Sequence, residues 1–238
     1  MIPLKDNVPT RSFPVVTVSL IVANVIVYVW EASGTGLNAH VISWGYYPCA
    51  VDGPCVGPAL HHHEVILTIL SSMFMHGGIV HIAGNMLFLW IFGNNVEDAL
   101  GPIRFLFFYL LAGVVATATQ TFVTLHFGTA TEASIPNVGA SGAIAGVLGA
   151  YFVLLPRASV FSLIFLGFFF IFREVPAILF LGIWILLQAL DGTFSLTTPA
   201  SGGGVAFFAH IGGFVFGVLT VNLFKQRDPL PPVYRFTA

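Results

Sequence analysis

The sequence predicts an all-α polytopic membrane protein: a bundle of six transmembrane helices with a long outer first loop and a membrane-dipping segment before the fifth span. Two observations carry this prediction. Of the 238 residues, 57% are hydrophobic and only 8% are charged, whereas about one quarter of an average soluble domain is charged. The apolar residues also gather in runs long enough to cross a bilayer. A net charge of −2 gives no concentrated basic surface and excludes a nucleic-acid partner.

Five runs without Asp, Glu, Lys or Arg approach the roughly 20 residues that a helix needs to span a bilayer. They are Phe13–Trp30, Ile79–Val96, Phe105–Leu125, Val138–Leu155 and Val205–Phe224. A sixth crossing is expected at Val175–Leu190, where Arg173-Glu174 interrupts a longer apolar tract. We expect residues 1–238 to form a single membrane domain with a short cytoplasmic tail at 228–238.

The first part of that tract, Ala158–Phe172, is too short to cross the membrane. As a helix its 15 residues would reach only about 22 Å. We therefore expect it to dip into the membrane face and return. The sequence leaves open whether it is a re-entrant helix, an interfacial strand or a looser segment.

The basic residues predict the direction of the spans, since Lys and Arg gather on the cytoplasmic side. With the N-terminus inside, all eight fall on the inner side, and the connections 31–78, 126–137 and 191–204 contain none. Both termini are then cytoplasmic. Because no Arg-rich presequence precedes the first span, a multi-pass protein of a prokaryotic plasma membrane is expected.

Two cysteines lie in the first outer loop. Cys49 and Cys55 would form a disulfide in an oxidising compartment. Two unpaired thiols fit the sequence equally well, so the pairing stays open.

Strongly polar side chains inside spans are costly and mark function. His81 and Asn85 share one face of the second span, because they are four residues apart. Ser141 lies near the start of the fourth span, and His210 near the start of the sixth. These three spans all run from outside to inside, so the polar groups lie at one level, within about 10 Å of the outer ends.

Glycines spaced four apart would let two of these spans approach closely. Gly142 and Gly146 lie on the fourth span, and Gly213 and Gly217 on the sixth. Small residues at this spacing allow membrane helices to pack backbone to backbone. Taken alone, either pair could be a packing feature only. Together they would bring Ser141 within hydrogen-bonding distance of His210.

A serine hydroxyl becomes a nucleophile when a neighbouring base accepts its proton. Ser141 and His210 would supply that pair. The tetrahedral intermediate then needs donors for its oxyanion, for which the candidates are His81, Asn85 and the Ser141 backbone N–H at a helix N-terminus.

Two other functions receive less support from the sequence. The tract His61–His63 beside Glu64 could bind a metal ion, but it lacks the second His of an HExxH zinc-protease helix. A transporter would show internal repeats and broken helices near the midplane. In this chain the polar side chains of the spans, His81, Asn85, Ser141 and His210, instead lie near one membrane face.

Three motifs, in order, resemble those of the rhomboid family of intramembrane serine proteases. The match runs from about Ser71 to Phe224. The first motif covers residues 72–78 with His81 and Asn85, the second covers 139–142, and the third covers 209–213.

The resemblance implies a six-helix rhomboid-like bundle and a Ser141–His210 dyad without an acidic third member. It implies an oxyanion site built from Ser141, His81 and Asn85. The residues implied to support this site are His76, Gly139 and Gly142.

The implied activity is hydrolysis of peptide bonds in or beside the transmembrane segment of membrane-protein substrates, in contact with membrane lipid. Neither a metal nor an organic cofactor is implied. The alternative is a catalytically silent rhomboid-like protein that binds membrane clients, although such relatives typically lose the serine or the histidine, and both are present here.

Two departures from the family pattern matter. The family often has Trp-Arg in the first outer loop, where this chain has Leu67-Thr68, so we expect a differently braced loop. Many members also place an aromatic ring four residues after the nucleophile, against the base, where this chain has Ala145. The imidazole of His210 would then be held by other side chains, such as Phe207, Phe208 or Phe214.

Overall fold

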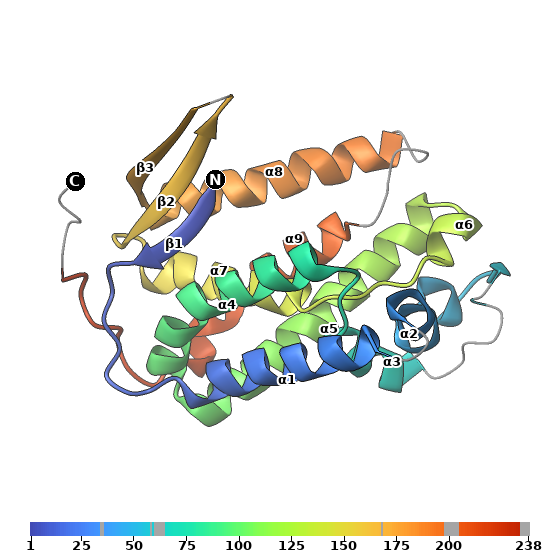
Figure 1. The fold of residues 1–238 in the computed structure, drawn as a ribbon, viewed down its shortest axis with the longest axis horizontal. Helices are drawn as coiled ribbons and strands as arrows, with labels where there is room; N and C mark the ends of the chain where they lie inside the picture. Colours follow the sequence, from blue (N-terminus) through green and yellow to red (C-terminus); the bar gives the residue numbers. More distant parts are fainter. Residues whose placement is uncertain (34–35, 58, 60–64, 168, 198–204, 234–238) are drawn as a thin grey trace.

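The computed structural model describes residues 1–33, 36–57, 59, 65–167, 169–197 and 205–233. Within these residues, six apolar helices of 14 to 26 residues form a bundle in which neighbours along the chain alternate in direction (Figure 1). They are α1 (Val15–Glu31), α4 (Ile79–Leu100), α5 (Pro102–Phe127), α7 (Ser141–Leu154), α8 (Ala177–Thr197) and α9 (Phe207–Phe224). Within the described residues, four helices are long and apolar enough to cross a membrane, namely α4, α5, α8 and α9, while α1 and α7 are shorter apolar helices. The predicted polytopic membrane bundle is confirmed.

Helix α7 is the centre of the bundle. All ten residues from Gly142 to Tyr151 are buried, because α7 is packed against α4, α5 and α9. A helix that is apolar all round is typical of such a buried position. Its 14 residues span only about 21 Å, which is less than the roughly 30 Å of a bilayer core. One of its two ends therefore lies well below a membrane surface.

Short elements cover the end of the bundle at which α4, α7 and α9 begin (Figure 1). They are α2 (Leu37–Trp44), the 3-10 helix η1 (Pro48–Ala50), α3 (Val65–Ser72) and α6 (Ala130–Ala133). Cys49 and Cys55 form a disulfide, which resolves the alternative that the sequence left open. Tyr46 pairs with Asn137 through two backbone hydrogen bonds of 3.1 and 2.7 Å, and its hydroxyl bonds Thr121 at 2.8 Å. These contacts brace the loop in which Leu67-Thr68 replace the family's Trp-Arg pair.

A small antiparallel sheet lies at the opposite end, with strand order β1-β2-β3. The strands are β1 (Ile2–Asp6), β2 (Ser159–Leu166) and β3 (Phe169–Pro176). Ile2 faces Leu163 across one ladder, and Phe165 faces Phe170 across the other. The segment whose form the sequence left open is therefore a β-hairpin completed by the N-terminal strand, and it is the non-helical part of a mostly helical fold. Periodicity alone does not separate a short apolar strand from a helix.

Two acidic residues at the end of α4 fasten α1 to the bundle. The buried Glu97 accepts hydrogen bonds from the Val16 and Thr17 backbone N–H groups at 2.9 and 2.7 Å. It thus satisfies amides at the start of α1, where a negative charge is favourable. The neighbouring Asp98 pairs with Arg11 at 2.9 Å and with Arg227 at 3.4 Å. The contact between Asp98 and Arg227 holds the segment after α9 against the end of α4.

Candidate active site

The structure brings Ser141 and His210 into direct contact. Ser141 is the first residue of α7, and His210 lies in the first turn of α9. The distance between Ser141 Oγ and His210 Nε2 is 2.8 Å, so the hydroxyl can donate to the imidazole. On the other side of the ring, His210 Nδ1 lies 2.7 Å from Gln188 Oε1, on α8. Because an amide oxygen only accepts hydrogen bonds, this contact requires the proton to be on Nδ1 and leaves Nε2 free to accept the serine proton.

Glycines set the distance between α7 and α9. A Cβ atom on Gly213 would meet the carbonyl oxygen of Gly142, and one on Gly217 would meet that of Gly146. The backbones of the two helices therefore touch at successive turns, as small-residue spacing permits. This contact fixes how far Ser141 lies from His210.

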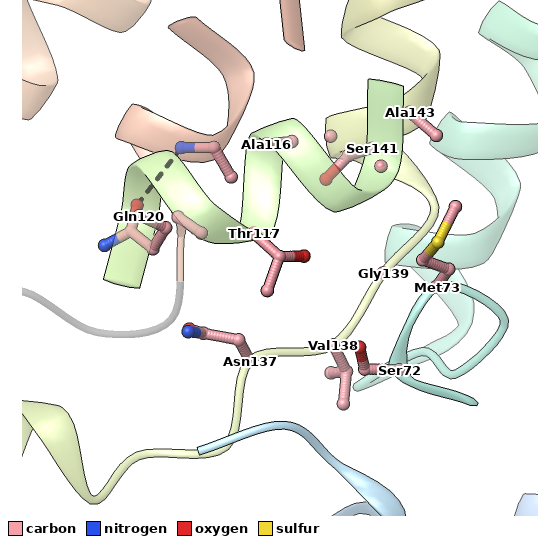
Figure 2. A pocket seen from close by; sticks show the side chains of 14 residues that line it. Ser72, Met73, Ala116, Thr117, Gln120, Asn137, Val138, Gly139, Ser141 and Ala143 are labelled. Carbon is pink, nitrogen blue, oxygen red and sulfur yellow. Dashed lines mark hydrogen bonds between the residues drawn. The ribbon is translucent and has the colours of Figure 1, made fainter. Parts of the chain in front are cut away.

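A second helix supports the N-terminus of α9. Gln120, on α5, accepts hydrogen bonds through Oε1 from the Phe208 and Ala209 backbone N–H groups at 3.1 and 3.2 Å. The bond to Ala209 is drawn as the dashed line in Figure 2. Gln120 acts as a cap supplied by a neighbouring helix, because the first amides of a helix lack acceptors in a preceding turn. The Ala209 N–H also donates to the carbonyl of the N-cap residue Ala206 at 3.1 Å. It holds the turn that carries His210.

Gly139 shapes the turn that precedes the serine. Its φ of +130° is one that residues with a side chain rarely adopt. A Cβ atom there would also lie 2.8 Å from His81 Nε2. The Gly139 N–H donates to the Ser72 carbonyl at 2.8 Å, which ties this turn to the end of α3. The turn leaves the first backbone amides of α7 without intrahelical acceptors.

His76 and Asn85 form a buried pair beneath the outer loop. Asn85 Nδ2 lies 2.9 Å from His76 Nε2 and donates to it, while His76 Nδ1 lies 3.3 Å from the Phe74 carbonyl and donates to that. The His76 backbone N–H bonds the carboxylate of Glu31 at 3.2 Å. Burial, followed by the neighbouring His81, lowers the pKa of His76 to about 4, so the ring is neutral at physiological pH. One Asn85 N–H is used by His76, and the amide nitrogen carries a second.

A cavity of about 1080 Å³ lies beside the Ser141–His210 contact. Its lining includes His81, Asn85, Ser141 and His210, together with the outer parts of α5 and α8. The ring and amide donors that the sequence predicted for the oxyanion thus face the same space as the serine. The volume is on the scale of a substrate site, for which several hundred Å³ is typical.

A smaller pocket borders Ser141, and Figure 2 shows the side chains that line it. Its volume is about 40 Å³, and Thr117, Gln120, Asn137 and Ser141 give it polar walls. One water needs roughly 10–15 Å³ of such space and two or more polar partners. The pocket is therefore large and polar enough to hold water beside the hydroxyl.

Two residues of α8 belong to the site although the sequence did not predict them. Trp184 lies against His210 with a centroid distance of 5.7 Å and an interplanar angle of 38°, and Gln188 bonds the same ring. Phe214, one of the residues expected to hold the imidazole, packs against Trp184 with 6.3 Å between the ring centroids. The sequence feature that could have identified Gln188 is its polar amide within an apolar span. No such feature marks Trp184.

The tract His61–His63 with Glu64, considered as a possible metal site, lies outside the residues that the structure describes. The site described above is built from residues of α4, α5, α7, α8 and α9 and of the turns that precede α4 and α7.

The apolar helix bundle defines a polytopic membrane protein, and the Ser141–His210 contact at the starts of α7 and α9 is its candidate site. Residues 63–227 match the family model of the rhomboid domain, which is well over half of the chain. The chain belongs to the rhomboid family.

Several characterised proteins are similar to this chain. The presenilin-associated rhomboid-like protein, mitochondrial, of Bos taurus is 32% identical over 174 residues, which is 70% of this chain and 41% of that protein. Rhomboid protein 1, mitochondrial, of Saccharomyces cerevisiae is 29% identical over 64% of this chain and 40% of its own length. The rhomboid protease GluP of Bacillus subtilis is 42% identical over 82 residues, or 34% of this chain and 14% of that protein. The chain thus spans about two fifths of the length of the first two relatives.

The predicted localisation in a prokaryotic plasma membrane with cytoplasmic termini is wrong. The relatives that match across 64–70% of this chain are named as mitochondrial proteins and not as proteins of a prokaryotic plasma membrane. The physical reason is that the positive charges on one side orient the spans in a membrane but do not say which membrane it is. Targeting depends on separate segments that receptors read, so the spans could not supply it.

Proposed function

We propose that this protein is an intramembrane serine endopeptidase in which Ser141 is the nucleophile and His210 is the general base and acid. The observation that carries the proposal is the 2.8 Å contact between Ser141 Oγ and His210 Nε2, in a ring whose other nitrogen already has an acceptor. A serine and a base at this distance satisfy the geometric requirement for nucleophilic catalysis. Membership of the rhomboid family supports the same chemistry.

In the proposed reaction, Ser141 Oγ attacks the carbonyl carbon of a substrate peptide while its proton passes to His210 Nε2. The oxyanion that forms is stabilised by donors aimed at it. The Ser141 N–H, His81 and the second N–H of Asn85 border the cavity and are the proposed donors. His210 then returns its proton to the leaving amine, and the serine ester remains.

Hydrolysis of this ester requires water in a site flanked by lipid. His210 would take a proton from a water molecule, whose oxygen attacks the ester carbonyl, and return that proton to Ser141 Oγ. The polar pocket next to Ser141 supports this step because it offers space and hydrogen-bond partners for water. The proposed substrates are membrane proteins, cleaved in or beside a transmembrane segment.

The test is cleavage of a single-span reporter protein by the purified protein in lipid vesicles. Ser141→Ala should abolish cleavage, a loss of at least about 10³-fold, because the nucleophile is removed while the fold is unchanged. A fluorophosphonate probe should label the unaltered protein and should label neither Ser141→Ala nor His210→Ala.

Two outcomes would contradict the proposal. Cleavage by Ser141→Ala at the original rate would rule out this nucleophile. Absence of both cleavage and probe labelling in the unaltered, folded protein would favour a catalytically silent member that binds membrane clients.

A further inference from the structure

Two side chains of α8 contact His210, and neither belongs to the dyad. Gln188 Oε1 lies 2.7 Å from Nδ1 of the ring, and Trp184 lies beside the ring face. The two residues are four apart in sequence and therefore share one face of α8. That face meets α9 at His210, so α8 contributes both an acceptor and a packing surface to one imidazole.

We propose that Gln188 is the positioning residue of the catalytic base. Its amide oxygen holds the proton of His210 on Nδ1, so that Nε2 presents a lone pair to the Ser141 hydroxyl. The inference rests on the proposed function, and it turns the implied dyad into a Ser–His–Gln arrangement in which the third member is uncharged.

The hydrogen bond decides between two forms of the ring. Neutral imidazole carries its proton on either nitrogen, and the partner of one nitrogen sets the state of the other. Without an acceptor at Nδ1, part of the population would carry the proton on Nε2. Such rings donate to Ser141 rather than accept from it, and they cannot act as a base.

Trp184 restricts the orientation of the ring. With Ala145 four residues after the serine, α7 supplies no aromatic side chain at that place. The indole of Trp184 occupies the side of His210 instead, and Phe214 lies behind the indole at 6.3 Å. Gln188 therefore sets the proton position and Trp184 sets the ring plane.

An amide suits this position because of its surroundings. An ionised carboxylate inside a membrane span is expensive, and at this partly buried position it would lack a compensating charge whenever His210 is neutral. A glutamine accepts the same hydrogen bond without a net charge. Its dipole still favours the imidazolium that forms when Nε2 takes the serine proton.

The first experiment compares cleavage by Gln188→Leu with cleavage by the unaltered protein. Leucine has a similar size but no acceptor, and we expect kcat to fall about tenfold to a hundredfold with KM little changed, as is usual when an orienting partner is lost. Thr193→Val is the matched control. Thr193 is exposed on the same helix, and its hydroxyl donates to the Ala189 carbonyl of that helix at 2.7 Å, so its replacement should leave kcat unchanged.

A second variant separates positioning from packing. Gln188→Glu keeps the acceptor and adds a negative charge, which favours imidazolium. We expect cleavage to persist, with the acid limb of the pH–rate profile moved to higher pH. A residue that merely fills space would produce no such shift.

The tautomer can also be measured without catalysis. In protein labelled with ¹⁵N-histidine, the His210 Nδ1 signal should be that of a protonated nitrogen, and Gln188→Leu should change it towards a mixture of both forms. An unchanged spectrum in Gln188→Leu would overturn the inference even if that variant were poorly active for another reason.

The outcomes also distinguish this inference from the proposed function. Cleavage that is lost in Ser141→Ala but unchanged in rate and pH profile in both Gln188 variants would overturn the inference alone. Equal losses in Gln188→Leu and Gln188→Glu without a shift of the pH profile would do the same. A folded, unaltered protein that neither cleaves the reporter nor takes up the probe would instead remove the proposed function.

Discussion

Gly139 is the residue at which backbone and side-chain constraints coincide. Its φ of +130° disfavours any side chain, and a methyl carbon at this position would lie 2.8 Å from His81 Nε2. The backbone conformation and the neighbouring His81 ring therefore both require glycine two positions before Ser141. Ser141 depends on this turn because α7 begins directly after it.

Gly139→Ala should lower cleavage strongly and destabilise the protein by about 1–3 kcal/mol, since the new methyl group meets both strain and a clash. Gly84→Ala is the control. Gly84 lies within α4 with nothing within 4 Å of a new Cβ, and alanine is favoured over glycine in a helix by roughly 1 kcal/mol. Thermal unfolding in detergent and reporter cleavage measure the two effects. Equal behaviour of the two variants would contradict this role of the turn.

The contact between α7 and α9 decides the geometry of the site at the scale of elements. A new Cβ on Gly213 would meet the Gly142 carbonyl and would also lie 3.3 Å from Ala145 Cβ. Neither atom can move away by a side-chain rotation, because the Gly142 oxygen is backbone and the Ala145 side chain is a single buried methyl group. The two helices would have to separate.

Gly213→Ala should therefore destabilise the protein by about 1–3 kcal/mol through overpacking and should reduce probe labelling of Ser141. Gly182→Ala, on α8, has open space around the new methyl group and should leave both properties unchanged. The comparison is made by unfolding and by labelling under identical conditions. A Gly213→Ala protein as stable and as reactive as the control would show that the helices do not depend on this contact.

The elements also show which features a sequence can predict. The apolar runs predicted the bundle, and the small-residue spacing on two spans predicted the close approach that brings Ser141 to His210. Both are local patterns. The β-hairpin was left open because its Phe-rich run fits a strand or a helix, and its partner β1 lies more than 150 residues away in sequence.

The contribution of α8 to the site could not be predicted either. Whether Trp184 and Gln188 face His210 depends on how α8 is rotated about its axis, and hydrophobic periodicity does not set that rotation in a helix that is apolar on most sides. The disulfide depended similarly on loop geometry, because two cysteines six apart can pair or remain apart.

Across the whole molecule, one carboxyl group links the sheet to the bundle. Asp6, on β1, accepts hydrogen bonds from the Tyr151 hydroxyl at 2.6 Å and from the Asn95 amide at 2.7 Å. Burial raises the pKa of Asp6 from 3.8 to about 6, although the bond from Tyr151 acts in the opposite direction. The folded protein therefore holds this proton more tightly than the unfolded chain does. The resulting stabilisation is fully present below pH 3.8 and is lost as the pH rises through about 6.

Asp6→Asn should remove this dependence, because asparagine keeps an oxygen acceptor and cannot ionise. We expect the difference in Tm, variant minus unaltered protein, to be more positive at about pH 8 than at about pH 5. In the control Asp228→Asn the replaced carboxyl is exposed, and its bond to Lys225 lowers its pKa, so no trend is expected over this range. A Tm difference for Asp6→Asn that stays constant between the two pH values would contradict the prediction.

The place of Gln188 on α8 has a consequence for how the proposed activity would be switched on and off. Ser141 and His210 are fixed to each other by the tight joint of α7 with α9, while the acceptor for Nδ1 arrives from a different helix. If α8 swung outward, the serine and histidine would stay together but the imidazole would lose its orienting partner. The proposed hydrolysis would then require α8 to be packed against α9. An outward movement of α8 would widen the cavity and at the same time stop hydrolysis until α8 returned.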